Sequence, residues 1–277
     1  MTSKKNSKIV TSTLRYIVLL MVAAFILLPY IWMILSSFRE GDDIFIKGSW
    51  IPDVWRWQNY VEAMHMAPFG RFFINSFITS TITVVAQLIT CPLAAFAFAK
   101  MKFKSKTFLF NIFLATMMVP AESTVIANYL TIASMKMTNT YFAIVAPSLT
   151  SMFAIFLLRQ FFKTIPDSLL EAAKIDGANI VQIFSMIVMP LAKSALATIV
   201  IFGFVNMWNA YLWPTLVTSE TSMRTVQTGL RYMVNADLGS EWPKILAAST
   251  VIILPVMAVF IGLQKYFVQG ITKVGLK

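Results

Sequence analysis

Residues 171–190 read EAAKIDGANIVQIFSMIVMP. This segment begins with polar residues and is interrupted by Gly177, whereas the stretches on either side of it are apolar. The pattern predicts two short helices joined by a tight turn, because glycine readily adopts the left-handed backbone that ends a helix. A membrane protein has little reason to keep an acidic, hinged element between its spans unless a soluble partner touches it. The segment therefore predicts a membrane protein with a contact site outside the bilayer.

The composition is that of an integral membrane protein. Of the 277 residues, 58% are hydrophobic and 13% are charged, and the mean hydropathy is +0.72. A soluble domain carries about 25% charged residues. A single cysteine, Cys91, excludes an intrachain disulfide. We expect an all-α integral membrane protein without a separate soluble domain.

Six apolar stretches are long enough to cross about 30 Å of hydrocarbon. We expect these spans at 14–36, 72–99, 108–130, 140–162, 191–213 and 245–267. Pro120 and Glu122 interrupt the third span, which predicts a kink or an early exit there.

The spans divide the chain into three parts. A basic N-terminus covers 1–13, a six-span domain covers 14–267 and includes the loop 165–190, and a tail covers 268–277. Gly270 and Gly275 predict a flexible tail without a stable helix of its own.

Basic residues gather on one side of the expected membrane. That side, which includes both termini and the loop 165–190, holds 15 basic and 3 acidic residues, a balance of 15 − 3 = +12, and so accounts for the whole net charge of +11. By the positive-inside rule it is the cytoplasmic side, so both termini are expected inside. The positive charge is thus a signal of topology and argues against a nucleic-acid partner.

The polar loop carries recognisable helix signals. Ser168 and Glu171 fit a capping box for the first helix, which Gly177 would end. Asn179, with a glutamine three residues later, fits the cap of the second helix, and Pro190 suits the beginning of the next span. A plain interfacial connector with a solvated polar face would account for the same residues.

Several separate blocks resemble one family. Besides the loop, they are NSFITSTITVVAQLITCPLAAFAFAKMKFKSK at 75–106, MMVPAESTVIANYL at 117–130, WNAYLWPTLV at 208–217 and QKYFVQGITKVGLK at 264–277. In combination they resemble the maltose-type, carbohydrate-uptake permeases of bacterial ABC importers. The last block resembles the tail of the G-type partner in a two-permease pair.

The resemblance implies a type I ABC importer permease fold in the bacterial cytoplasmic (inner) membrane. It implies three partners: a second homologous permease, a cytoplasmic ATPase dimer and an extracytoplasmic solute-binding protein. The tail would insert between the two ATPase subunits. The loop would dock on the ATPase through residues that we expect to be Ser168, Glu171, Ala172, Ala173, Asp176 and Gly177.

The chain lacks the chemistry of an enzyme. No Gly-x-x-x-x-Gly-Lys-Ser/Thr loop occurs, so ATP and Mg would be bound by the partner ATPase and no cofactor by this chain. The only histidine, His65, has no obvious companion ligands, and no metal site is expected.

A solute pathway is expected near the external half of the fifth span. Aromatic faces stack on the C–H faces of sugars, and amides bond hydroxyl groups. An aromatic belt at the membrane interface is the alternative for the same residues. The pathway residues expected are Glu122, Asn206, Trp208, Asn209, Tyr211 and Trp213.

A long external segment, 218–241, is expected to contact the solute-binding protein through Arg224, Gln227, Arg231 and Tyr232. The alternative is a disordered loop.

Together these patterns predict a permease subunit of an ATP-driven, binding-protein-dependent importer of a carbohydrate. The solute favoured by the resemblance is an oligosaccharide. One alternative is a permease for a phosphorylated polyol such as glycerol phosphate, whose basic ligand could come from the partner chain. Another is a stand-alone secondary carrier. That class needs carboxylates or histidines at mid-membrane, where Glu122 is the only clear candidate.

Overall fold

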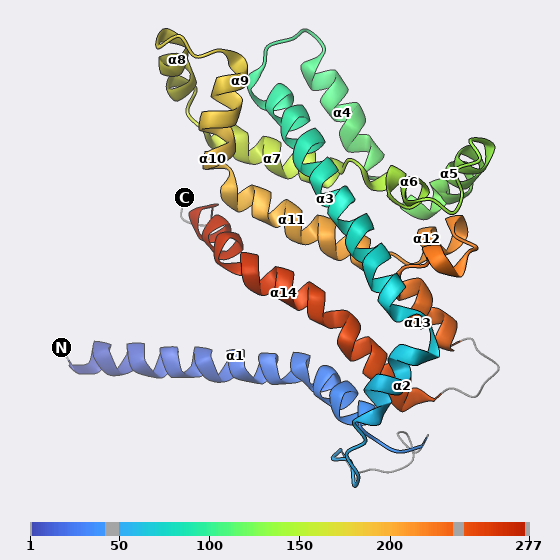
Figure 1. The fold of residues 1–277 in the computed structure, drawn as a ribbon. Helices are drawn as coiled ribbons and strands as arrows, with labels where there is room; N and C mark the ends of the chain where they lie inside the picture. The colour runs from blue at the N-terminus through green and yellow to red at the C-terminus, as the bar shows by residue number, and fades with distance from the viewer. Residues whose placement is uncertain (1, 42–49, 235–240, 275–277) are drawn as a thin grey trace. The chain divides into compact units, whose positions relative to one another are not determined.

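A computed structural model describes residues 2–41, 50–234 and 241–274, with side chains described for 12–41, 50–234 and 241–266. These residues are overwhelmingly helical and include no β-strand (Figure 1). The chain divides into two compact units. One comprises 1–67 and 230–253, and the other comprises 68–229 and 254–277.

The first unit contains α1 (Thr2–Ser37) and α2 (Gln58–Met66). Apolar side chains along α1 are exposed, as expected for a helix that faces lipid. Beyond α1, the Phe38 ring packs against Trp55, Trp57 and Tyr60 at centroid distances of 4.6–5.1 Å. The Asn59 amide donates hydrogen bonds to the carbonyl oxygens of residues 37 and 39. The turn after α1 is therefore a packed structure.

The second unit is built around α3 (Phe69–Lys100), which packs against α7 (Met152–Thr164) and α11 (Lys193–Trp208). Its core joins small residues of α3, Cys91 and Ala95, to large ones such as Leu158 and Phe162. The helices α4 (Lys106–Thr116), α5 (Ala121–Ser134), α6 (Tyr141–Val145) and α12 (Leu212–Val217) complete this unit with the short helical turns Ala146–Ser148 and Thr221–Met223.

Between α7 and α11 lies the polar loop. It contains α8 (Asp167–Ile175), α9 (Ile180–Gln182), a π-helical stretch Ile183–Val188 and α10 (Met189–Leu191). Two helices, α13 (Val226–Val234) and α14 (Trp242–Val274), contribute residues to both units.

Three helical segments are long and apolar enough to span a membrane: 12–37, 69–100 and 242–266. Three helix pairs qualify as bent spans, α4 with α5, residues 141–148 with α7, and residues 180–191 with α11. Their bends are 94°, 44° and 77°. The described residues thus hold three candidate spans, or up to six if each bent pair is one span, in line with the six expected. The kink expected at Pro120 is confirmed, since Pro120 immediately precedes α5.

The tail differs from expectation. The helix α14 continues through Val274, so residues 268–274 form the end of α14 and not the flexible tail that was expected, although they make no separate helix of their own. Extending an existing helix costs far less than nucleating one, so Gly270 does not end it. Residues 275–277 lie outside the described residues.

Candidate functional site

The polar loop has one predicted cap and lacks the other. Asn179 Oδ1 accepts from the Gln182 amide at 2.9 Å, and Gln182 Oε1 accepts from the Asn179 amide at 2.8 Å, so this capping box is confirmed. The box expected at Ser168 and Glu171 is wrong. The helix α8 begins at Asp167, directly after Pro166, which places Ser168 inside the first turn, and no side chain caps that helix.

The turn after α8 has the predicted backbone. Gly177 adopts φ +84°, in the left-handed region, and its amide donates to the Lys174 carbonyl oxygen. A Cβ atom at Gly177 would meet nothing within 4 Å. Backbone conformation, not space, is therefore what requires glycine here.

Both polar and apolar side chains of the loop face outward. Leu170 is buried and anchors α8 to the core, whereas Glu171, Ala172 and Asp176 are exposed and Ala173 is partly packed. The Ile175 side chain is 87% exposed. The expected docking residues thus share α8 and the turn that follows it, and their contact with an ATPase stays a prediction.

Basic residues near the loop bind particular backbone groups. Lys106 Nζ donates to the Ala99 and Met101 carbonyl oxygens at 3.0 Å, and Arg159 Nε donates to the Phe98 carbonyl oxygen at 3.1 Å. Cations near the last carbonyls of a helix satisfy those groups and suit the negative end of its dipole. The end of α3 is held by these contacts, which the sequence did not reveal.

A third cation links α3 to the loop. Lys100 Nζ donates to the Ile165 carbonyl oxygen and to Asp167 Oδ1, each at 2.6 Å. The hydrogen bond and the charge of Lys100 hold the pKa of Asp167 below its usual value. The first residue of α8 is thereby fixed to the last residue of α3.

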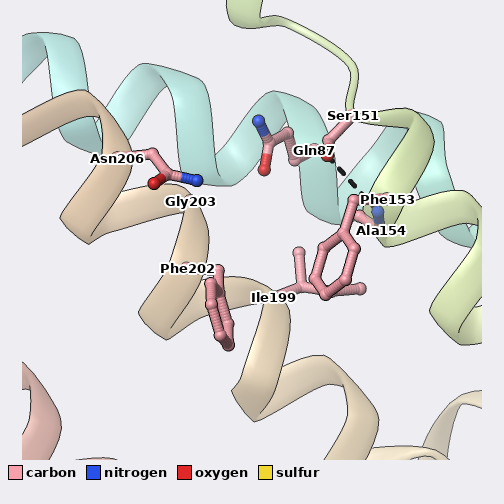
Figure 2. Close-up of a pocket in the computed structure, with 8 residues that line it drawn as sticks. All are labelled: Gln87, Ser151, Phe153, Ala154, Ile199, Phe202, Gly203 and Asn206. Carbon is pink, nitrogen blue, oxygen red and sulfur yellow. Dashed lines mark hydrogen bonds between the residues drawn. The ribbon is translucent and has the colours of Figure 1, made fainter. Parts of the chain in front are cut away.

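A cavity of about 330 Å³ lies between α3, α7 and α11 (Figure 2). Aromatic rings and uncharged polar side chains surround it. The lining residues are Gln87, Ser151, Phe153, Ala154, Ile199, Phe202, Gly203 and Asn206.

Of the expected pathway residues, Asn206 is the one that lines this cavity. Trp208 is fully buried and stacks on Phe204 at 5.4 Å, and the Trp213 indole donates to two backbone carbonyls of α6. Asn209 Oδ1 accepts from Gln227.

The two remaining pathway residues are exposed. Glu122 lies in the first turn of α5, and the Tyr211 side chain is 39% exposed. Gln87, Ser151, Phe153 and Phe202 were not expected at a site from the sequence. An amide inside an apolar span was the one available signal, and it pointed to Gln87.

The external segment is ordered in its described part. Asn139 Oδ1 accepts from the amides of Ser219 and Glu220, and Asn75 Nδ2 donates to the carbonyl oxygens of Ser222 and Arg224 at 2.8 Å. Residues 218–234 therefore do not form a disordered loop, whereas residues 235–240 lie outside the described residues.

The four expected contact residues occupy this ordered segment. Gln227, Arg231 and Tyr232 belong to α13, and Arg224 directly follows the short helical turn Thr221–Met223. The Tyr232 side chain is 60% exposed, and Arg231 is also exposed. Contact with a binding protein stays a prediction.

Comparison with known proteins decides the family. Residues 91–273 match the family described as the binding-protein-dependent transport system inner membrane component. The chain belongs to this family. It is a multi-pass inner-membrane transport component, so the stand-alone carrier is set aside.

Similar proteins point to related transport systems. The sn-glycerol-3-phosphate transport system permease protein UgpE of Yersinia enterocolitica is 33% identical over 264 residues, which are 92% of this chain and 94% of that protein. The protein of the same name from Salmonella typhi is 35% identical over 216 residues, 78% of this chain and 76% of that protein.

A solved structure supports the fold. A bacterial ABC transporter involved in the import of the acidic polysaccharide alginate matches with a TM-score of 0.80 at 25% identity, covering 94% of this chain and 98% of that chain. The type I ABC importer permease fold is therefore confirmed. The relatives' names agree with the phosphorylated-polyol alternative better than with an oligosaccharide.

Proposed function

We propose that this permease serves an importer of a small phosphorylated polyol of the sn-glycerol 3-phosphate type, driven by a separate cytoplasmic ATPase. The observation that carries the proposal is the 33% identity, over nearly the whole chain, to a permease named for that solute. The cavity supports a small solute as well. Its volume of about 330 Å³ lies near the lower end of the about 300–1,000 Å³ usual for ligand pockets.

The phosphate requires a cation that the cavity does not supply, because none of its eight lining residues is charged. Arginine and lysine are the side chains that recognise phosphate most strongly. In this proposal the second, homologous permease provides that cation, and the present chain provides uncharged contacts.

Energy enters through the loop 165–190. The exposed side chains Glu171 and Ile175 of α8, with Asp176 just after it, contact the ATPase in this proposal. The positive-inside rule favours the same, cytoplasmic side for both termini. Lys100 passes a displacement of α8 to α3, because it bonds both Ile165 and Asp167. Since α3 also carries Gln87 of the cavity wall, ATP-driven movement of the loop reaches the solute path and supports alternating access.

Solute arrives from an external binding protein that docks on the segment 218–234. The hydrogen bonds from Asn75 and Asn139 hold residues 219–224 of this segment in a fixed shape, which reduces the entropy lost on docking. Arg231 and Tyr232 offer an exposed charge and an exposed ring for that contact.

Uptake by the reconstituted complex tests the solute. Proteoliposomes with both permeases, the ATPase and the binding protein are given labelled sn-glycerol 3-phosphate, maltotriose or an alginate oligosaccharide. We expect ATP-dependent uptake of the first alone, and no uptake by this permease without its partners. Uptake of an oligosaccharide in place of sn-glycerol 3-phosphate would contradict the proposal.

A further inference from the structure

The cavity is organised around one buried amide. Gln87 is 6% exposed, and its Nε2 donates to the Ser148 carbonyl oxygen at 2.9 Å. Only the nitrogen of the amide can donate to a carbonyl, so this bond fixes which end is the oxygen. A Cβ atom at residue 203 would come within 2.8 Å of that oxygen, Oε1. Gly203 therefore leaves room for a hydrogen-bond acceptor at the cavity wall.

A break between two helices adjoins Gln87. At the bend before α7, the carbonyl oxygens of Ser148, Leu149 and Ser151 accept from Gln87, Thr90 and Cys91 of α3. Irregular backbone at membrane depth is tolerated where it is buried in protein or lines a cavity, and transporter sites are often built at such breaks. Ser151 immediately precedes α7 and caps it, because its Oγ accepts from the Ala154 amide; its hydroxyl hydrogen is left available to donate.

Two aromatic rings and a second amide complete the lining. Phe153 and Phe202 lie 5.5 Å apart, and each is 43% exposed. The exposed amide of Asn206 has no hydrogen bond within the described residues and lies on the same side of α11 as the cavity (Figure 2). The cavity thus offers an acceptor, a hydroxyl and a free amide beside apolar ring faces.

Polar side chains also occur along α3 beyond the residues that line the cavity. Thr83 and Ser80 lie one and two turns before Gln87 on the same helix face. Both are buried, and their hydroxyl groups have no partner in the part of the chain that the structure describes. A row of uncharged hydrogen-bonding groups can bind hydroxyl groups well, but it binds a phosphate poorly because it offers no positive charge.

We propose that this cavity binds the hydroxyl-bearing end of the solute and that it selects for hydroxyl groups. Gln87, Ser151 and Asn206 bond the hydroxyls, and Phe153 and Phe202 cover the C–H faces. The phosphate end then lies outside this chain's lining. The identity of the solute rests on the proposed function, whereas recognition of hydroxyl groups does not.

The test compares two solutes that differ by one hydroxyl group. Uptake of labelled sn-glycerol 3-phosphate and of 3-hydroxypropyl phosphate, which lacks the middle hydroxyl, is measured in the reconstituted complex at saturating binding protein. The binding protein is the same in every experiment, so its own selectivity affects the ratio of the two uptake rates equally in the wild type and in each variant. We expect Asn206→Ala to lower the ratio of the two rates by about three- to tenfold, the effect of one hydrogen bond.

A second variant and two controls sharpen the test. Phe202→Ala should lower the uptake of both solutes by a similar factor, about tenfold, because ring contact does not depend on the hydroxyl. Asn111→Ala and Phe260→Ala, which change an exposed amide and a 44% exposed ring outside the cavity, should leave the ratio and the rates unchanged.

Three outcomes are decisive. An unchanged ratio in Asn206→Ala together with unchanged rates in Phe202→Ala overturns the subsite. Loss of co-purification with the second permease in both cavity variants also overturns it, because the cavity would then be a packing surface. If the wild-type complex imports an oligosaccharide instead, the proposed function fails, and the subsite is tested separately with that oligosaccharide and its deoxy analogue.

Discussion

The ammonium group of Lys100 lies 2.6 Å from the carboxylate of Asp167, and it joins the last residue of α3 to the first residue of α8. The lysine side chain is 8% exposed, whereas the aspartate side chain is 77% exposed. A buried cation therefore holds an acidic residue at the N-terminus of α8, where negative charge is favourable. This contact makes the beginning of the loop part of the membrane unit.

This ion pair predicts a pH-dependent attachment of α8. Because the pKa of Asp167 is lowered in the folded protein, its stabilising contribution is present above the ordinary carboxyl pKa and is lost as pH falls through the lowered pKa. Hydrogen exchange of residues 167–175, corrected for intrinsic rates, should therefore accelerate below about pH 4. Asp167→Asn should show faster exchange at neutral pH and little further change on acidification. An equal acid response in this variant would contradict the assignment.

The Gly177 turn predicts a graded effect of substitution on coupling. Gly177→Val should lower the number of solute molecules imported per ATP hydrolysed, because a β-branched residue at φ +84° carries strain of about 1–2 kcal/mol or more. Gly177→Asn should retain most of the coupling, since asparagine tolerates the left-handed region. No atom crowds the position, so similar losses in both variants would show that backbone conformation is not the cause.

Charge reversal at Glu171 should weaken the binding of the ATPase without affecting the fold. The side chain is exposed and makes no hydrogen bond or ion pair within the described residues, so Glu171→Lys should leave the abundance of the permease unchanged. If α8 docks on a basic group of the ATPase, reversal replaces attraction by repulsion and should weaken co-purification of the ATPase. Asp53→Lys, at an exposed acidic position in the first unit, is the control. Normal assembly and transport by Glu171→Lys would count against the docking proposal.

Asn139 predicts a stability effect at the external segment. Two features of Asn139 affect stability separately: its backbone has a φ of +58°, and its side chain accepts hydrogen bonds from the amides of Ser219 and Glu220. Asn139→Gly keeps the backbone and loses the bonds, whereas Asn139→Ala loses both and should have the lower unfolding temperature in detergent. Lys136→Gly, at φ +56°, should cause no comparable loss. Equal unfolding temperatures for the glycine and alanine variants of Asn139 would refute this division.

We expect Trp213 to have a structural role. Its indole Nε1 lies 2.9 Å from the Ala143 carbonyl oxygen and 3.2 Å from that of Ile144. Trp213→Phe leaves these buried carbonyls without that donor and should cost about 1–3 kcal/mol, measured as a lower unfolding temperature in detergent. Tyr211→Phe, at an exposed neighbouring ring, should change stability little. A selective transport defect in Trp213→Phe at normal stability would instead favour a direct role in the solute path.

The sequence by itself determined the helical class, the six apolar stretches, the kink at Pro120, the turn at Gly177 and the cap at Asn179. Hydropathy and backbone preference act on neighbouring residues, so they can be read from the chain alone. Pro166 shows the limit of this reading, because it moved the beginning of α8 and removed the cap expected at Ser168.

Only the tertiary structure decided how distant side chains meet. It assigned Lys100, Lys106 and Arg159 to particular carbonyl groups, although the sequence marked them only as positive charges. It buried Trp208 and brought Gln87, Ser151 and Asn206 from three helices to one cavity. Such sites depend on how helices bend and pack, because residues more than 50 positions apart along a chain become neighbours only when the helices that carry them touch.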